Sequence, residues 1–472
     1  MTQPACNDLT NEVNLFLKAN PDVLRDDYEL VKKLCLEKKA NFPGQNADSI
    51  TPVPHFIESE KYQYLCEMSE KVFNAFERVV ENYFTDIRIR QFYPHLEKYQ
   101  RLVSLPVRQT PVITMARFDI IESIDGQYKI IEPNASAPGF TLLLPIMDEV
   151  LRQTQLHRWI SERYDLVPTP IHDKQTVFNC LVLEHKKIFG PKNKYKVLIA
   201  YTNYQTRFAS HDHYLKMVKV YSEHMIQVAE YCGIDIEIAP IQEIRFVNGA
   251  PIFNAKPFDI VYHFLDISFS NETANIAANF NEIESFLEGI IKSAFLLVNP
   301  FASCLIADKS LLALVRDPNF HYLFSEDELR AIDQLIPETF IISNSTVTFQ
   351  NEKLNLIKML KSQKDSFVIK AQMGREGRDV IIGHQTSKEE WEREVDASID
   401  AQVIAQRLVT PRKYQIGKPD GTYELMNHSL GMYMMAGKAK GMVNRVSPDS
   451  IVNISRGGTC QLVQPFRLKK SD

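Results

Sequence analysis

The chain has 472 residues, of which 44% are hydrophobic and 24% are charged, and its formal net charge is −5. A chain of this length buries substantial hydrophobic cores and is typical of two to four packed units, not of a small disulfide-stabilised scaffold. The weakly acidic balance argues against a general nucleic-acid binder, which would carry a basic excess. Seven dispersed cysteines without a Cys-x-x-Cys pair indicate a reducing compartment.

The sequence contains no stretch typical of a signal peptide and no apolar run that approaches the length of a membrane span. We therefore expect a cytoplasmic protein without a membrane partner, and the net charge predicts no nucleic-acid partner. Nothing in the sequence indicates an oligomeric state.

The first hundred residues are predicted to be mostly helical. Apolar residues recur at three- and four-residue spacing over 12–17 and again over 62–84, which is the pattern of helices with one buried face. Residues 41–54 between these segments are rich in Pro, Gly and Asn, and we expect a long surface loop there.

Two extended segments joined by an Asp-Gly turn follow, over residues 114–122 and 128–134. An Asp-Gly pair between such segments is a strong short-range signal for a β-hairpin. In this hairpin Asp119 lies opposite Glu132 and Asn134. Because residues two apart point to the same side of a strand, these side chains are predicted to share one face of the sheet.

Arg117 is expected on the same face, two residues before Asp119. Two carboxylates and an amide supply the hard oxygen ligands that suit Mg²⁺ carrying substrate phosphates. Arg117 can hold an anion beside such a metal. The alternative is an exposed hairpin with solvated charges, and an isolated motif of this kind more often has that meaning.

The middle of the chain has a different pattern. Strands are predicted at 195–200, 235–239 and 259–264, with a helix over 211–233. This succession of strand, helix, strand and strand predicts a small parallel α/β unit. His263 lies on an apolar strand, so we expect a core histidine there and not a general base.

Residues 367–383 predict a strand, a glycine loop and a second strand. The first strand ends at Lys370, and the loop contains Gly374 and Gly377. Backbone amides of such a loop can close over phosphates, and glycine permits their close approach. The segment is neither a Walker loop nor a dinucleotide fingerprint, because no helix directly follows it. A tight turn with exposed arginines is the alternative.

Three further segments carry candidate nucleotide-binding residues. Lys309 follows an apolar segment, where a solvated lysine on a helix surface is the alternative. Residues 403–409 predict an apolar strand whose backbone, around Gln406 and Leu408, can meet an adenine; simple core burial is the alternative. Arg445 lies on a predicted strand from which it can reach a terminal phosphate, and a surface salt bridge is its alternative.

Taken together, these segments resemble the ATP-grasp superfamily in circularly permuted form. The lysine, glycine-loop, hinge and arginine elements lie within residues 309–445, whereas the hairpin at 117–134 comes earlier in the chain. This rotated order resembles the glutathionylspermidine-synthase-like branch. Segments 299–300 and 457–458 are also similar to phosphate-binding segments of that branch. The resemblance covers roughly residues 117–463.

The sequence departs from the family pattern in three respects. The loop Gly374-Arg375-Glu376-Gly377-Arg378 is more charged than the glycine pairs usual in the family. Arg407 stands where an acidic residue often follows the glutamine. We find no amidase domain with a catalytic cysteine, so a bifunctional synthetase–amidase is not expected.

The resemblance implies a mixed α+β and α/β fold, in which a circularly permuted ATP-grasp core is joined by a small Rossmann-like pre-ATP-grasp unit and a helical N-terminal region. The expected boundaries are 1–100 for the helical region, 101–170 for the metal-binding hairpin and its helix, 171–298 for the Rossmann-like substrate unit and 299–472 for the nucleotide-binding subdomains.

The same resemblance implies an ATP-dependent carboxylate–amine ligase with ATP and Mg²⁺ as cofactors. In such ligases a substrate carboxylate attacks the γ-phosphate to give ADP and an acyl phosphate, and an amine then displaces phosphate. The expected partners are a small-molecule or peptide carboxylate and an amine acceptor.

The resemblance also implies a role for each candidate residue. The metal ligands would be Asp119, Glu132 and Asn134, the ATP-binding residues Lys309, Lys370, Gly374, Gly377, Gln406 and Leu408, and the catalytic residues Arg117 and Arg445. Two other functions stay open: an ATP-dependent phosphotransferase, and a catalytically silent nucleotide-binding or interaction protein. The presence of both carboxylates and both lysines argues against the silent protein.

Overall fold

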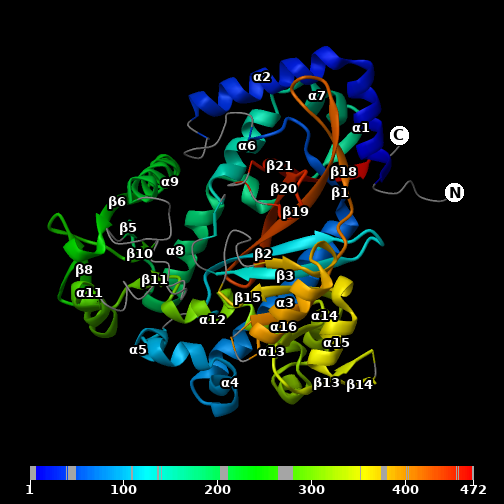
Figure 1. Cartoon of the computed structure of the whole chain (residues 1–472). Coiled ribbons are helices and arrows are strands. Elements are labelled where there is room, and N and C mark those ends of the chain that lie inside the picture. Colours follow the sequence, from blue (N-terminus) through cyan, green and yellow to red (C-terminus); the bar gives the residue numbers. More distant parts are fainter. Residues whose placement is uncertain are drawn as a thin grey trace.

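The protein is described by a computed structural model. The described residues are 7–38, 40, 49–107, 110–135, 138–139, 141–201, 211–263, 280–350, 352–373, 380–399, 401, 403–452, 454 and 457–469. Figure 1 shows a large central sheet, with a small parallel sheet on the left and a helix-covered unit with its own sheet at the lower right.

The central sheet has eight strands, six of them in the order β1-β21-β20-β19-β2-β3, while β18 pairs with β19 and β4 with β21. Strand β1 is parallel to β21, and the other neighbours are antiparallel. The strands are β1 (His55–Glu58), β2 (Met115–Glu122), β3 (Tyr128–Asn134), β4 (Tyr164–Leu166), β18 (Tyr414–Gly417), β19 (Tyr423–Met435), β20 (Lys438–Ser447) and β21 (Thr459–Leu468).

Strands β2 and β3 confirm the predicted hairpin. Asp119 pairs with Glu132, and Arg117 pairs with Asn134. Gly126 in the connecting turn has φ of +82°, a conformation that favours glycine and accounts for the Asp-Gly signal. The four polar residues therefore lie at neighbouring register positions on one face of the hairpin.

The opposite face of the hairpin packs against helix α3 (Ser59–Tyr83). Phe118 alternates with the polar residues, and its ring lies 6.3 Å from that of Phe73 and 5.4 Å from that of Phe76. These rings are fully buried, and burial of apolar area contributes about 25 cal/mol per Å². Packing on one face thus leaves the other face available to polar groups.

The predicted helical N-terminal region is confirmed in part. Helices α1 (Asn7–Ala19), α2 (Pro21–Glu37) and α3 are present, but strand β1 lies before α3 and was not predicted. The expected surface loop is wrong for its described part, residues 49–54, because Ile50 bridges to Cys460 and Thr51 is fully buried. This segment runs beside β21, where it covers an otherwise open sheet edge.

The small parallel sheet has the order β11-β10-β5-β6, and all its neighbours are parallel. The predicted parallel unit is therefore present, with β11 as an added strand at its edge. Its elements and those of an adjoining three-stranded sheet are α8 (Thr176–Phe189), β5 (Lys196–Tyr201), α9 (His211–Tyr231), β6 (Asp235–Pro240), β7 (Arg245–Val247), β8 (Ala250–Phe253), β9 (Lys256–Pro257), β10 (Ile260–His263), α11 (Phe280–Lys292) and β11 (Leu296–Val298).

The third unit contains an antiparallel sheet in the order β12-β17-β15-β16. The pairing of β15 with β16 confirms the predicted hairpin, whereas its glycine loop, including Gly374 and Gly377, lies outside the described residues. The elements are β12 (Thr339–Ile341), β13 (Thr346–Phe349), β14 (Glu352–Asn355), α15 (Leu356–Ser362), β15 (Phe367–Ala371), β16 (Val380–Ile382), α16 (Lys388–Ala397) and β17 (Val403–Arg407).

The remaining helices connect these units. They are α4 (Ile87–Phe92), α5 (Gln100–Val103), α6 (Leu143–Leu151), α7 (Gln155–Ser161), α12 (Cys304–Ala307), α13 (Ser310–Arg316) and α14 (Glu326–Leu335). Across the described part of the chain, no helix is both long and apolar enough to pass through a bilayer.

Candidate active site

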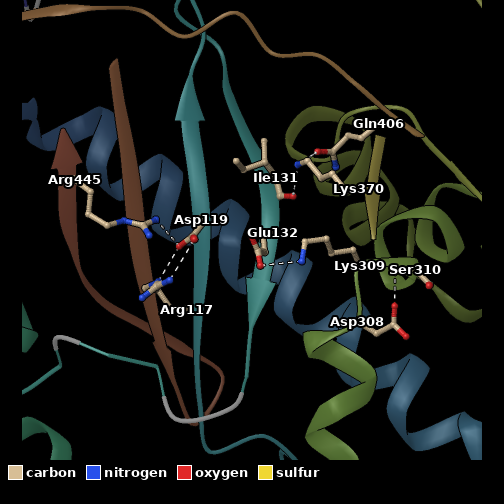
Figure 2. Close-up of polar contacts among 10 residues, drawn as sticks. All are labelled: Arg117, Asp119, Ile131, Glu132, Asp308, Lys309, Ser310, Lys370, Gln406 and Arg445. Carbon is tan, nitrogen blue, oxygen red and sulfur yellow. Dashed lines mark hydrogen bonds and ion pairs between the residues drawn. The ribbon is translucent and has the colours of Figure 1, made fainter. Parts of the chain in front are cut away.

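The polar face of the β2–β3 hairpin forms the centre of the candidate site. Figure 2 shows that Arg445 approaches Asp119 from the neighbouring part of the central sheet, while Lys309 and Lys370 approach β3 from the opposite side. Three parts of the chain that are distant in sequence therefore supply charged groups to one small area of the sheet.

Asp119 lies between two arginines. Arg117 donates from Nε to Oδ1 at 2.8 Å and from Nη2 to Oδ2 at 3.2 Å, while Arg445 Nη2 lies 2.9 Å from Oδ1. Arg445 Nη2 also donates to Ser429 Oγ at 3.0 Å, across the β19–β20 pair. The side chains of Arg117, Asp119 and Arg445 are all largely buried. The single Asp119 carboxylate contacts both arginines and holds them in place.

The charge state of Asp119 follows from these neighbours. Burial on its own would raise the pKa of Asp119, but the Arg117 and Arg445 guanidiniums outweigh burial and hold that pKa below its ordinary value. Burial would likewise lower the pKa of Arg117, yet the facing Asp119 carboxylate raises it. Asp119 is therefore ionised at neutral pH.

Glu132 contacts a cation from the connecting segment between α12 and α13. Lys309 Nζ lies 3.0 Å from Glu132 Oε1, and only 5% of the Lys309 side chain is exposed, against 26% for Glu132. The Lys309 backbone N–H donates to the Gln372 carbonyl at 3.0 Å. Lys309 precedes α13 and is buried, so the alternative of a solvated lysine is wrong.

Lys370 lies beside this ion pair at the end of β15. Its Nζ donates to Gln406 Oε1 at 2.7 Å and to the Ile131 carbonyl of β3 at 3.4 Å. Burial, reinforced by the nearby Lys309 charge and opposed by Glu132, lowers the pKa of Lys370 to about 8. Lys370 thus carries its charge at neutral pH, but it loses that charge as the pH rises through about 8.

Gln406 is a buried residue of β17, which lies between β12 and β15 in the sheet of the third unit. Its Nε2 donates to Thr339 Oγ1 at 3.2 Å while its Oε1 accepts from Lys370, so the side chain orients the lysine. The backbone N–H of Leu408 donates to the Ser366 carbonyl at 2.8 Å. That amide is engaged within the fold, which leaves other groups of Leu408 to meet an adenine.

Asn134 lies opposite Arg117 at the end of the hairpin. Its Nδ2 atom is buried, and within the described residues it has no hydrogen-bond partner. An unpaired buried amide is costly, since removal of a polar group from water is offset only by a new hydrogen bond. Asn134 is therefore suited to contact a bound group.

Sequence reasoning missed the contacts behind Lys309. Fully buried Asp308 accepts from the Ser310 N–H at 2.8 Å, and its second oxygen lies 2.5 Å from His95 Nε2. Asp308 directly precedes Lys309, but His95 is far away in the sequence. No local pattern connects the two, so only the tertiary structure identifies this support.

The site carries an excess of positive charge. Four cationic side chains, Arg117, Lys309, Lys370 and Arg445, surround two carboxylates, Asp119 and Glu132, which leaves an excess of two positive charges. Clustered, largely buried cations of this kind attract a polyanion such as a polyphosphate.

The donor set also fits Mg²⁺. This ion is usually held by one or two protein carboxylates together with substrate phosphate oxygens. Asp119 and Glu132 are directly opposed, and Asn134 offers an amide on the same face. In the part of the chain that the structure describes, no group of three or more His, Cys, Asp or Glu residues gathers into a metal cluster. A metal here would compete with Arg117 and Arg445 for Asp119, and with Lys309 for Glu132.

The fold and the site together define a protein of mixed α/β architecture with a cationic, carboxylate-bearing sheet face beside a separate antiparallel sheet. No protein-family model and no curated protein matches the sequence. A glutathione synthetase-like effector from Globodera pallida, solved in the apo form, has a TM-score of 0.60 and 13% identity, and the similarity covers 94% of this chain and 97% of the effector. This likeness establishes that the chain shares the fold of that effector.

Two other solved structures are more distant. A putative γ-glutamylcysteine synthetase from Methylobacillus flagellatus has 14% identity and a TM-score of 0.38, with 85% of this chain and 87% of the other covered. D-alanyl-alanine synthetase A from Vibrio cholerae has 11% identity and a TM-score of 0.27, with 55% and 69% covered. At these TM-scores neither likeness carries weight for the site.

Proposed function

We propose that the protein is an ATP-dependent carboxylate–amine ligase, which forms an amide bond and releases ADP and phosphate. The observation that supports this most is the contact between Glu132 of the hairpin and Lys309 of the connecting segment between α12 and α13, with Lys370 beside it. This contact brings a candidate metal ligand next to two candidate phosphate ligands, as a reaction on the γ-phosphate requires.

We further propose that the core is a circularly permuted ATP-grasp fold. The candidate phosphate-binding residues lie in residues 299–472, after the hairpin unit of 101–170, and residues 171–298 would form a Rossmann-like substrate unit. A helical N-terminal region of 1–100 completes the proposed organisation. The fold that the chain shares with a glutathione synthetase-like effector supports the general architecture. The permuted order is proposed from the positions of the segments in the sequence.

In the proposed reaction Asp119, Glu132 and Asn134 hold Mg²⁺. When bound, the ion neutralises charge on the β- and γ-phosphates of ATP. Asp119 contributes by remaining ionised, which the two arginines ensure. Glu132 is the more exposed of the two carboxylates, so it is the ligand that can exchange its lysine for a metal.

Lys309 and Lys370 bind the nucleotide phosphates in this proposal. Lys309 transfers its contact from Glu132 to a phosphate oxygen, and Gln406 keeps Lys370 directed toward β3. The loop containing Gly374 and Gly377 would supply backbone amides to the phosphates. Leu408 would border the adenine through groups other than its engaged N–H.

Arg445 and Arg117 are proposed to act on the reacting groups. A substrate carboxylate oxygen attacks the γ-phosphorus while the bond to ADP breaks, and Arg445 neutralises the transferred phosphoryl group. The amine nitrogen then attacks the acyl carbon, phosphate leaves with the bonding electrons, and the nitrogen loses a proton. Arg117 stabilises the acyl phosphate and its tetrahedral successor. Removal of one such contact typically costs about 10²–10³ in rate.

The proposed substrates are a small-molecule or peptide carboxylate and an amine acceptor. The name of the glutathione synthetase-like neighbour is compatible with a peptide-like carboxylate. Because Cys35, Cys66, Cys180 and Cys304 are among the free thiols of the described residues, we also propose a cytoplasmic location.

The test is Mg²⁺-dependent release of ADP and phosphate over a panel of carboxylates paired with amines, with product masses measured by mass spectrometry. Release that requires one pair, together with a product mass equal to both substrates minus water, supports the ligase. ADP formation without free phosphate indicates a phosphotransferase instead. ATP binding without stimulation by any pair contradicts catalysis of this type.

A further inference from the structure

The buried side chain of Asn299 is hydrogen bonded to both strands of the hairpin. Its Oδ1 accepts from the backbone N–H groups of Thr114 and Met115, each at 3.0 Å. Its Nδ2 donates to the carbonyls of Met115 and Ala135, each at 2.6 Å. The amide therefore uses two acceptor and two donor positions, all on backbone groups, and none remains for a phosphate.

These contacts lie where the ladder between β2 and β3 ends. The last pair of the register is Arg117 with Asn134, and Ala135 follows directly. Two residues further along, at the next position that faces the partner strand, Met115 would exchange both its hydrogen bonds with an extension of β3. The Asn299 amide makes that exchange instead and also holds the carbonyl of Ala135. A side chain thus replaces a strand residue and fixes the separation of the two strand ends.

Asn299 itself is held by the parallel sheet. It directly follows β11, and its carbonyl accepts from Nε2 of His263, the last residue of β10, at 2.6 Å. The His263 ring lies 5.2 Å from that of Phe301. The carboxyl ends of two parallel strands are therefore connected through one residue to the hairpin that carries the candidate metal and anion ligands.

We propose that Asn299 is a positioning residue, which sets the relative placement of Arg117 and Asn134. Arg117 lies two residues after Met115, and Asn134 directly precedes Ala135, so one amide anchors the backbone next to both. The consequence for catalysis rests on the proposed ligase function. Displacement of a reacting group by about 1 Å can cost about 10² in rate, which is the size of effect expected when the anchor is lost.

The position of Asn299 predicts a selective effect. The candidate phosphate ligands are Lys309, which directly precedes α13, and Lys370 of β15, and they have their own supports in Gln372 and Gln406. Loss of the Asn299 donors should therefore leave nucleotide affinity nearly unchanged while turnover falls. If the substitution instead reduced the amount of folded protein, ADP binding and turnover would fall together.

The test uses Asn299→Asp in the full-length protein, because Asp has the same size, keeps the acceptor oxygen and removes both donors. A matched control is Asn14→Asp. Asn14 is also buried, and its Nδ2 donates to the Gln415 carbonyl at 3.2 Å, joining α1 to β18 away from the site. Three quantities are measured: hydrogen exchange of peptides covering 112–118 and 129–135, the Kd for ADP, and the kcat for ADP release.

For Asn299→Asp we expect exchange in the two hairpin peptides to rise by about tenfold or more, kcat to fall by about 10² and the Kd for ADP to change by less than about twofold. Asn14→Asp should leave all three at wild-type values. Wild-type exchange in Asn299→Asp overturns the proposal, and so does a loss of ADP affinity as large as the loss of kcat.

Two further arms keep the test decisive. If the wild-type protein releases no ADP, the proposed function fails, whereas the exchange measurement still decides whether Asn299 anchors the hairpin. If Asn299→Asp does not fold, His263→Phe removes the donor to the Asn299 carbonyl. We then expect a smaller rise in hairpin exchange in the same peptides, and wild-type exchange overturns the proposal.

Discussion

Asp119 and Glu132 occupy directly opposed positions of β2 and β3, yet their carboxylates contact cations from different parts of the chain. Asp119 is held by Arg117 and Arg445 within the central sheet, and Glu132 is held by Lys309 from the connecting segment between α12 and α13. One carboxylate is thus fixed inside the sheet, while the other contacts a connecting segment outside the sheet. This difference leads to separate expectations for the two residues.

We expect Asp119→Asn to destabilise the protein more than Glu132→Gln. The first change leaves two buried guanidiniums without a carboxylate, and breaking a buried pair of this kind costs about 3–5 kcal/mol. Glu132 is partly exposed, so its loss should cost less. Urea unfolding monitored by circular dichroism measures the difference in the free energy of unfolding. Equal stability of the two variants would contradict the asymmetry of the site.

Both variants should lose Mg²⁺-dependent ADP release by at least about 10², because each removes one proposed metal ligand. Assays are run under conditions in which circular dichroism shows the variants folded. Asp333→Asn serves as the control, since Asp333 pairs with Arg316 on the surface and is 77% exposed. Turnover close to wild type in folded Glu132→Gln would rule out its assignment as a metal ligand.

Nucleotide affinity should fall as the pH rises through about 8. The pKa of Lys370 is lowered from 10.5 to about 8, so the side chain is protonated below this pH and loses its charge above it, well before an ordinary lysine would. Calorimetric titration with ADP between pH 6.5 and 9.5 measures the effect. Lys370→Gln should bind ADP weakly with little pH dependence over this range; an unchanged wild-type slope in that variant would assign the titration to another group.

Two substitutions of Gln406 should act in different ways on Lys370. Gln406→Glu places a carboxylate at the position that now accepts from Lys370 at 2.7 Å, which should raise the lysine pKa and move the loss of ADP affinity above pH 8. Gln406→Leu removes the acceptor and should weaken ADP binding by about tenfold, about the value of one hydrogen bond to a charged group. The same calorimetric series distinguishes them, and superimposable pH profiles would exclude this contact as the cause.

Much of the hairpin could be predicted from local sequence. The Asp-Gly turn sets the register, and alternation places Arg117 and Asp119 on the face opposite Phe118. The strands before and after the glycine loop were predictable for the same reason. By contrast, β1 and the burial of residues 50–54 were missed, because Pro- and Asn-rich composition indicates a loop while pairing with β21 is a long-range event.

The sequence by itself determined which residue types face one another across β2 and β3, since turn chemistry and two-residue periodicity are local properties. Only the tertiary structure decided which cations contact the carboxylates of Asp119 and Glu132. Arg445 reaches Asp119 through the order of strands in the central sheet, and Lys309 reaches Glu132 because α12 and α13, which flank Lys309, share a hydrophobic core with the hairpin. Such contacts depend on distant segments folding against one another, and no local pattern encodes them.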